Sequence, residues 1–260
     1  MTEEYFLEPF PPIRRATVDL LAASSRKHMI HGLIELDVTS TRQVLRAYRR
    51  MMDQAVSLSS YLIYCCARAV EKTPHVQAYR DYRNRLYIFK NVDVAAPVER
   101  EIAGNKEIVP CIIREANLKS PVEIQNLLNQ AQTMQVERSR VFSLMKIYVL
   151  IPRFIRKSFF RFMDLFPKLM KKNGGTVMVS SLNMFGDGTG WGIPLASHTL
   201  NLTLGGMTRK PVVVGDKVEN HEFLCVTVSI DHDLVDSAPA ARFIHDFKEL
   251  VEKSARLEAA

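Results

Sequence analysis

The sequence predicts a mixed α/β fold in which helices flank a sheet. Apolar residues recur at helical spacing through much of the first half, whereas the last third holds β-rich runs separated by glycine-bearing turns. Strands and helices do not alternate strictly, and there is neither a GxGxxG after a strand nor a GxxxxGK[ST]. The chain therefore gives no support to nucleotide binding of the Rossmann or P-loop type. Its 260 residues, 47% of them hydrophobic, suffice for one large domain or two small ones.

The first half predicts three helices and a strand. A double proline precedes a helix from about Ile13 to Arg26, and "MIHGLIELDV" then alternates weakly as a strand. "TSTRQVLRAYRRMMDQA" begins with hydroxyl caps and is typical of a helix. "SLSSYLIYCCARAVEKTP" predicts a more buried helix that stops before Pro74.

The remainder predicts strands, one capped helix and a closing helix. Short strands are expected in "RLYIF", "NVDVAAPV" and "EIVPCIIRE". A helix begins where Ser120 precedes Pro121, with Glu123 three residues after the cap. Four β-rich runs follow, "GGTVMVSSLNMFG", "ASHTLNLTLGG", "KPVVVGDKV" and "EFLCVTVSIDH", with glycine-bearing turns between them. "SAPAARFIHDFKELVEKSA" closes the chain as an amphipathic helix.

Charge and cysteine usage narrow the class of protein. The formal charge is +7, but the segment 136–173 alone carries ten basic residues against two acidic ones, so the rest is near neutral. We therefore expect no nucleic-acid partner. The cysteines show no CxxC spacing, so neither a metal site nor a disulfide framework is expected. The N-terminus lacks a basic start followed by an apolar run, which predicts a cytoplasmic protein.

The stretch "DHDLVD", residues 231–236, is the main candidate for chemistry. A histidine at the end of an apolar strand, with a carboxylate four residues later, is typical of a general base, because the ordinary pKa of histidine lies near neutrality. The same residues are also typical of a polar turn in which an aspartate or serine caps a helix. The turn by itself does not decide between the two readings.

Six blocks in a fixed order resemble one family. "DHDLVDSAPAARFIHDFKELVE" resembles the D-H-R-x-x-D-G signature of the acyltransferase catalytic domain of 2-oxo-acid dehydrogenase complexes, within the chloramphenicol acetyltransferase-like, CoA-dependent superfamily. "GGTVMVSSLNMFG" is similar to its GGTFTISNLGMFG strand and "RKPVVVGDKV" to its RRPVVVDGEV hairpin. "IRRATVDLLAAS", "IELDVT" and "EIVPCIIREANLKSPVEI" resemble its RRAIAERMxxS, VDVDVT and LVVPVIRDADxKSLxEI. The resemblance implies a chloramphenicol acetyltransferase-like α/β fold.

The resemblance also implies roles for individual residues. His232 falls on the family's catalytic histidine, and Ser180 on the strand hydroxyl that donates a hydrogen bond to the oxyanion, with Ser181 as the fallback if the register slips by one. Asp236 falls on the second acidic position, which in the family forms an ion pair with a first-helix arginine, here Arg14 or Arg15. No residue is assigned to cofactor binding.

Two positions depart from the family pattern. The family's arginine after the histidine is Asp233 here, and its glycine after the second acid is Ser237. If that glycine has a positive φ, a serine would strain the turn.

We therefore expect residues 1–12 to be an extension and residues 13–260 one acyltransferase domain. It would belong to a stand-alone member without lipoyl or subunit-binding domains, with no covalently bound lipoate in the chain and no metal. The resemblance implies acyl-CoA as co-substrate, a thiol, hydroxyl or amine acceptor of small-molecule or lipoyl type, and a homotrimer or a higher assembly of trimers. The alternative is a catalytically degenerate trimeric scaffold or binding protein.

The basic segment, at about 136–173, is an insertion relative to the family. Aromatic and aliphatic residues alternate with arginine and lysine in helical pieces broken by Pro152 and Pro167, and the apolar run is too short to span a membrane. One interpretation is that its apolar face packs on the domain while its charges are solvated. The other is a lid, or a basic amphipathic helix that contacts a membrane or carrier protein.

Overall fold

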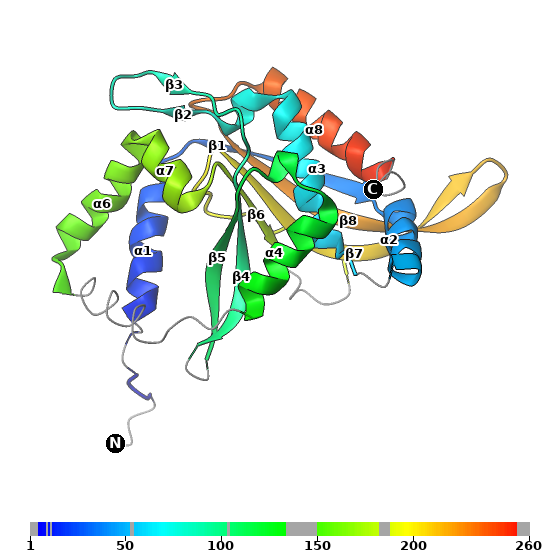
Figure 1. Ribbon diagram of the computed structural model, residues 1–260, viewed down its shortest axis with the longest axis horizontal. Helices are drawn as coiled ribbons and strands as arrows, with labels where there is room; N and C mark the ends of the chain where they lie inside the picture. The colour runs from blue at the N-terminus through cyan, green and yellow to red at the C-terminus, as the bar shows by residue number, and fades with distance from the viewer. Residues whose placement is uncertain are drawn as a thin grey trace.

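The strands form one large sheet and a small ribbon (Figure 1). The computed structural model describes residues 5–8, 10, 12–52, 55–102, 105–133, 150–181 and 188–253. Within these ranges the sheet has six strands in the order β1-β8-β7-β6-β4-β5, and β2 pairs with β3 separately. The strands are β1 (Met29–Asp37), β2 (Tyr79–Arg80), β3 (Leu86–Tyr87), β4 (Val94–Ile102), β5 (Asn105–Ile113), β6 (Val177–Ser181), β7 (Leu200–Val214) and β8 (Lys217–Asp231).

Some helices pack on the sheet, and others lie at one end of the molecule (Figure 1). α3 packs against α8 and α4, whereas α1 and α6 lie side by side at the end opposite the β7–β8 hairpin. The helices are α1 (Pro12–Ser24), α2 (Thr39–Met52), α3 (Leu58–Lys72), α4 (Pro121–Thr133), α6 (Arg153–Leu165), α7 (Pro167–Gly174) and α8 (Ser237–Glu252), with 3-10 turns at Pro74–Gln77 and Ala116–Leu118. None of the helices within the described ranges has both the length and the apolarity to cross a membrane.

The core lies between the sheet and α3, α4 and α8. Val226, Val228 and Ile230 alternate along β8 and are buried, as are Phe243 and Phe247 of α8. Cys65 and Cys66 are buried free thiols on α3, and burial raises the pKa of Cys65 to about 12. The two cysteines therefore serve as small core residues.

Several helix starts lie where the capping residues of the sequence predict them. Ser57 caps α3 by accepting a hydrogen bond from the Ser60 backbone N–H. At α4 the Glu123 backbone N–H donates to Ser120 Oγ (3.2 Å), while Glu123 Oε2 accepts from the Ser120 N–H (2.7 Å). These contacts form the predicted capping box. Helix α6 begins directly after Pro152, its N-cap residue, and α7 begins at Pro167, because proline fits the start of a helix but not its interior.

The expected turn at Gly205 and Gly206 is wrong. β7 runs through both glycines as one 15-residue strand, with an irregularity in its pairing to β8 between Leu204 and Met207. A Cβ at Gly205 would lie 2.2 Å from the Gly190 carbonyl oxygen, and one at Gly206 the same distance from that of Gly188. The glycines therefore permit close approach of a second segment, and they mark a bulge rather than a chain reversal.

The expectation that the insertion packs its apolar face on the domain is met only in part, because Met170 of α7 is buried whereas three phenylalanines of α6 are largely exposed. Arg156 is buried and lies 3.3 Å from Asp19 Oδ2 of α1. Phe154, Phe159 and Phe162 are instead 71%, 51% and 51% exposed. The helix thus turns Arg156 inward and these three phenylalanines outward, and residues 136–149 of the insertion lie outside the described ranges.

Candidate active site

His232 lies just beyond the end of β8 with its side chain exposed. Its backbone N–H donates to the carbonyl oxygen of His28 (2.8 Å), in the link between α1 and β1. This bond holds the backbone of the turn without using the imidazole. The ring is thereby left accessible to a substrate.

The buried side chain of Asp231 also stabilises this turn. Its nearly buried carboxylate accepts a hydrogen bond from the Asp233 N–H through Oδ1 (3.2 Å) and pairs with Lys27 Nζ through Oδ2 (3.2 Å). Asp164 of α6 is close enough for mutual electrostatic influence: burial raises the pKa of its carboxyl, Lys27 opposes that rise, and Asp231 adds to it. Lys27 therefore supplies the positive charge that stabilises the carboxyl groups of both Asp231 and Asp164.

Replacing Lys27 with methionine is expected to destabilise the fold by about 3 kcal/mol, because it strands a buried carboxylate without its cation. The free energy of unfolding from urea titration measures the effect. Adding Asp231→Asn to Lys27→Met should recover most of the loss, since the uncompensated charge is then gone. Equal losses in the single and double variants would show that Lys27 acts through another group.

The two departures from the family pattern are accommodated. Asp233 Oδ1 lies 3.0 Å from His28 Nδ1, so a local partner takes up its carboxylate. Ser237 is the first residue of α8, and the non-glycine residues with positive φ in the described ranges are Asn84 and Glu115. The expected condition for strain at Ser237 is therefore not met.

Ser180 lies on β6 beside Thr203 of β7. The two residues are partners in the parallel pairing, and their hydroxyl oxygens are 3.3 Å apart. Ser180 Oγ also lies 3.5 Å from the Leu202 carbonyl oxygen. Ser181 pairs with Leu204 and points to the opposite side, because neighbouring strand residues alternate. Of the two serines, Ser180 is therefore the one on the same sheet face as Thr203.

The start of β6 is held by a glycine and a buried histidine. Gly175 has φ 84°, and a Cβ there would lie 2.8 Å from the Asp93 carbonyl oxygen. His198 Nε2 donates to the Gly174 carbonyl oxygen (2.8 Å), and burial lowers the pKa of His198 to about 4. A neutral imidazole thus fixes the turn that leads into the Ser180 strand. Sequence reasoning missed His198, since a lone histidine carries no local signal of burial.

One chain does not bring His232 and Ser180 together. Ser180 pairs with Thr203, and Thr203 with Thr227, so two strand spacings, about 10 Å, separate β6 from β8. His232 lies a further five residues along, about 17 Å at strand rise. A reaction that needs both side chains would require a second subunit.

Asp236 occupies the N-cap position of α8, but its side chain makes no capping hydrogen bond. Asp236, Arg14 and Arg15 are all exposed, and no ion pair between Asp236 and either arginine is found among the described side chains of one chain. The expected pair thus stays a prediction for an assembly.

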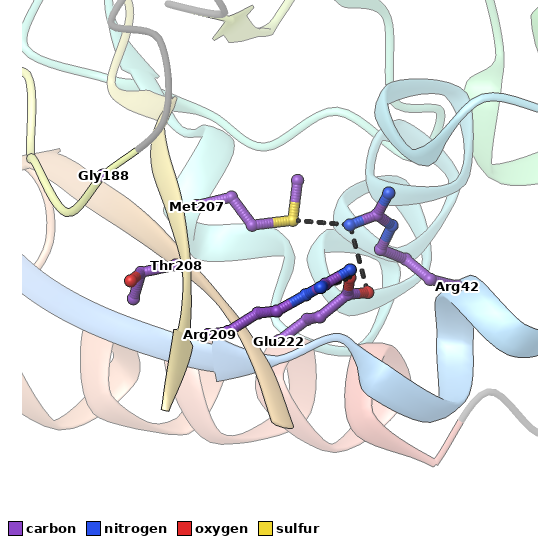
Figure 2. Close-up of a pocket in the computed structure, with 6 residues that line it drawn as sticks. All are labelled: Arg42, Gly188, Met207, Thr208, Arg209 and Glu222. Atoms are coloured by element: carbon purple, nitrogen blue, oxygen red, sulfur yellow. Dashed lines mark hydrogen bonds and ion pairs between the residues drawn. The ribbon is translucent and has the colours of Figure 1, made fainter. Parts of the chain in front are cut away.

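A cavity of about 560 Å³ opens beside β7 and β8 (Figure 2). Arg42 of α2 points across it toward Met207 and Glu222, and Arg42 Nη1 lies 3.2 Å from Met207 Sδ. The lining residues are Arg42, Gly188, Met207, Thr208, Arg209 and Glu222.

Three guanidinium groups converge on one carboxylate at this cavity. Glu222 is nearly buried and pairs with Arg42 (3.0 Å), Arg209 (3.2 Å) and Arg46 (3.5 Å). The cluster has a surplus of two positive charges, which suits an anionic group of a ligand. Sequence reasoning missed it, although Arg42 and Arg46 stand at i, i+4 spacing on a predicted helix.

A family model describes most of this chain. The model of the 2-oxoacid dehydrogenases acyltransferase (catalytic domain) matches residues 2–141 and 168–259. The chain belongs to this family. The acyltransferase fold predicted from the six sequence blocks is therefore confirmed, while residues 142–167, which include α6, lie outside the match.

Individual proteins that are similar to this chain are acyltransferases of the same family. The acetyltransferase component of the Rickettsia prowazekii pyruvate dehydrogenase complex is 23% identical over 96% of this chain, which spans about half of that relative (55%). A probable dihydrolipoamide acetyltransferase from Listeria monocytogenes has a TM-score of 0.70 at 19% identity, covering 99% of this chain and 98% of that one. The Azotobacter vinelandii dihydrolipoamide acetyltransferase has a TM-score of 0.69 at 18% identity, covering 97% and 94%. These structures share the acyltransferase fold with this chain.

Proposed function

We propose that this acyltransferase domain moves an acyl group between acyl-CoA and a dihydrolipoyl-type thiol at a site between two subunits. The observation that carries the proposal is the accessible His232 imidazole on a backbone-anchored turn. Ser180, on a neighbouring subunit, would complete the site. Turnover of acetyl-CoA with dihydrolipoamide, compared with hydroxyl and amine acceptors, tests the reaction and its acceptor class.

The reaction needs one base and one hydrogen-bond donor. The His232 imidazole takes the proton of the acceptor thiol, and the resulting thiolate attacks the thioester carbonyl carbon. Ser180 Oγ–H donates to the oxyanion of the tetrahedral intermediate. When the intermediate collapses, the C–S bond to CoA breaks and the CoA thiolate receives the proton from the imidazolium. No net proton is gained or lost by the protein.

Residue spacing supports these roles. In the Azotobacter enzyme the roles of a serine, a histidine and an asparagine in the catalytic mechanism were investigated, and there the histidine follows the serine by 52 residues and the asparagine follows the histidine by four. In this chain His232 also follows Ser180 by 52 residues, and Asp236 follows His232 by four. Asp236, which stands where that relative has an asparagine, is thus proposed as the residue that supports His232.

The cavity lined by Arg42 and Arg209 is proposed to hold the phosphates of CoA. Arg42 and Arg209 offer guanidinium groups to an anion, and such groups pair well with phosphate. Met207 stands four residues along β7 from Thr203, the strand partner of Ser180, so the cavity lies about 13 Å from that partner. That span suits the pantetheine arm, which separates the CoA thiol from its phosphates.

Arg209→Gln is expected to raise KM for acyl-CoA about tenfold with kcat unchanged, because it removes a charged contact to phosphate but none at the reacting carbonyl. Steady-state kinetics at varied acyl-CoA measure the change. With acyl-pantetheine, which lacks the phosphates, the variant and the parent should have equal KM. Arg80→Gln, at an exposed arginine on β2, is the matched control. Equal KM increases with both substrates would remove the phosphate assignment.

A degenerate scaffold is the alternative function. It would keep the fold but bind no CoA. Isothermal titration with CoA separates the two functions, since a scaffold gives no binding heat at concentrations that saturate an active relative.

A further inference from the structure

The outward face of α6 concentrates exposed aromatic and aliphatic side chains. Phe154, Ile155, Phe159 and Phe162 fall on one side of the helix, because positions i, i+1, i+5 and i+8 span less than half a turn of its circumference. Leu150, just before the helix, is 82% exposed. An exposed apolar cluster on a folded protein is typical of a surface that binds an apolar partner, such as another protein or a membrane.

The orientation of α6 is held by its inward side. Arg156 reaches Asp19 of α1, and both side chains are buried. At the C-terminal end the ring of Phe166 lies 4.2 Å from that of Phe162 and 5.4 Å from that of Tyr82, between centroids. Rolling the aromatic face inward would pull Arg156 from its buried carboxylate. The exposed face is therefore a feature of the packed helix.

The surrounding charge is strongly positive. Residues 150–174, from just before α6 to the end of α7, contain seven basic residues and one acidic residue. Lys168 and Lys172 of α7 are exposed. Aromatic side chains beside lysine and arginine on a helix that does not cross a membrane are typical of a helix that lies on an anionic lipid surface.

A lipid surface fits these observations better than a second copy of the chain. Two α6 faces pressed together would bring two strongly basic segments into contact, and like charges oppose that association. The family model also omits residues 142–167, so the family's own fold does not account for α6. We propose that the outward face of α6 docks this protein on an anionic phospholipid membrane.

Vesicle co-sedimentation of the full chain tests the proposal. We expect binding to vesicles of phosphatidylcholine and phosphatidylserine in low salt, weaker binding in high salt, and little binding to phosphatidylcholine alone. The double variant Phe154→Ser, Phe159→Ser should bind at least about tenfold more weakly, because two exposed rings no longer insert. Its acyltransferase turnover in solution should match the parent, so a failure here is distinct from a failure of the proposed reaction.

A matched control lies at the other end of the molecule (Figure 1). Val213 and Val218 on the β7–β8 hairpin are 73% and 70% exposed, so Val213→Ser, Val218→Ser removes two exposed apolar side chains away from α6. This variant should bind vesicles like the parent. Three results would overturn the proposal: no binding by the parent in low salt, equal loss in both double variants, or a smaller oligomer of the Phe154→Ser, Phe159→Ser variant by light scattering, which would place α6 between copies.

Discussion

His232→Ala is expected to lower kcat by about 10²- to 10⁴-fold, the range that a positioned general base contributes. The thermal midpoint should stay close to that of the parent, because the turn is held by the His232 backbone N–H and by Asp231, neither of which the substitution removes. Turnover of acetyl-CoA with dihydrolipoamide, followed by release of CoA thiol, measures the loss.

The control for this variant is His245→Ala. His245 is an exposed histidine on α8, the helix that follows the turn. Its replacement should leave kcat unchanged. If His232→Ala kept the full activity of the parent, as His245→Ala should, the imidazole of the turn would have no part in proton transfer, and another group would have to act as the base.

Ser180→Ala is expected to lower kcat by about 10²- to 10³-fold, the usual cost of one lost oxyanion donor. KM for acyl-CoA should change little, because the hydrogen bond strengthens only as negative charge develops on the carbonyl oxygen. Ser181→Ala is the matched control, since Ser181 pairs with Leu204 and points away from the Thr203 face. The reverse result, with Ser181→Ala inactive, would shift the donor by one residue.

Co-expression of the two inactive variants tests where the site forms. If His232 of one subunit meets Ser180 of another in a cyclic trimer, about a quarter of the interfaces in a random mixture carry both native side chains. Mixed trimers should then recover about that fraction of parental activity. A site within one chain would recover nothing, which would conflict with the separation of the two residues in the sheet.

Much of the secondary structure was predictable because its causes are local. The Ser120 and Glu123 pair caps α4 through bonds between residues three apart, and Pro152 and Pro167 act through their own rings. Gly205 and Gly206 misled the prediction, since their role depends on Gly188 and Gly190, which approach from another segment. The order of the six blocks, a property of the whole chain, identified the family correctly.

The sequence by itself determined the fold class, the family and the choice of His232 and Ser180 as candidates, because strand and helix periodicity and block order are written along the chain. Only the tertiary structure decided which groups meet. Lys27 reaches Asp231 from 204 positions away, and Arg42 and Arg209 meet at Glu222 through three separate elements. The outward face of α6 follows from the partner that Arg156 finds in Asp19. Such contacts depend on how the helices and strands pack, and the residues adjacent to one partner in the sequence do not indicate which distant residue it will contact.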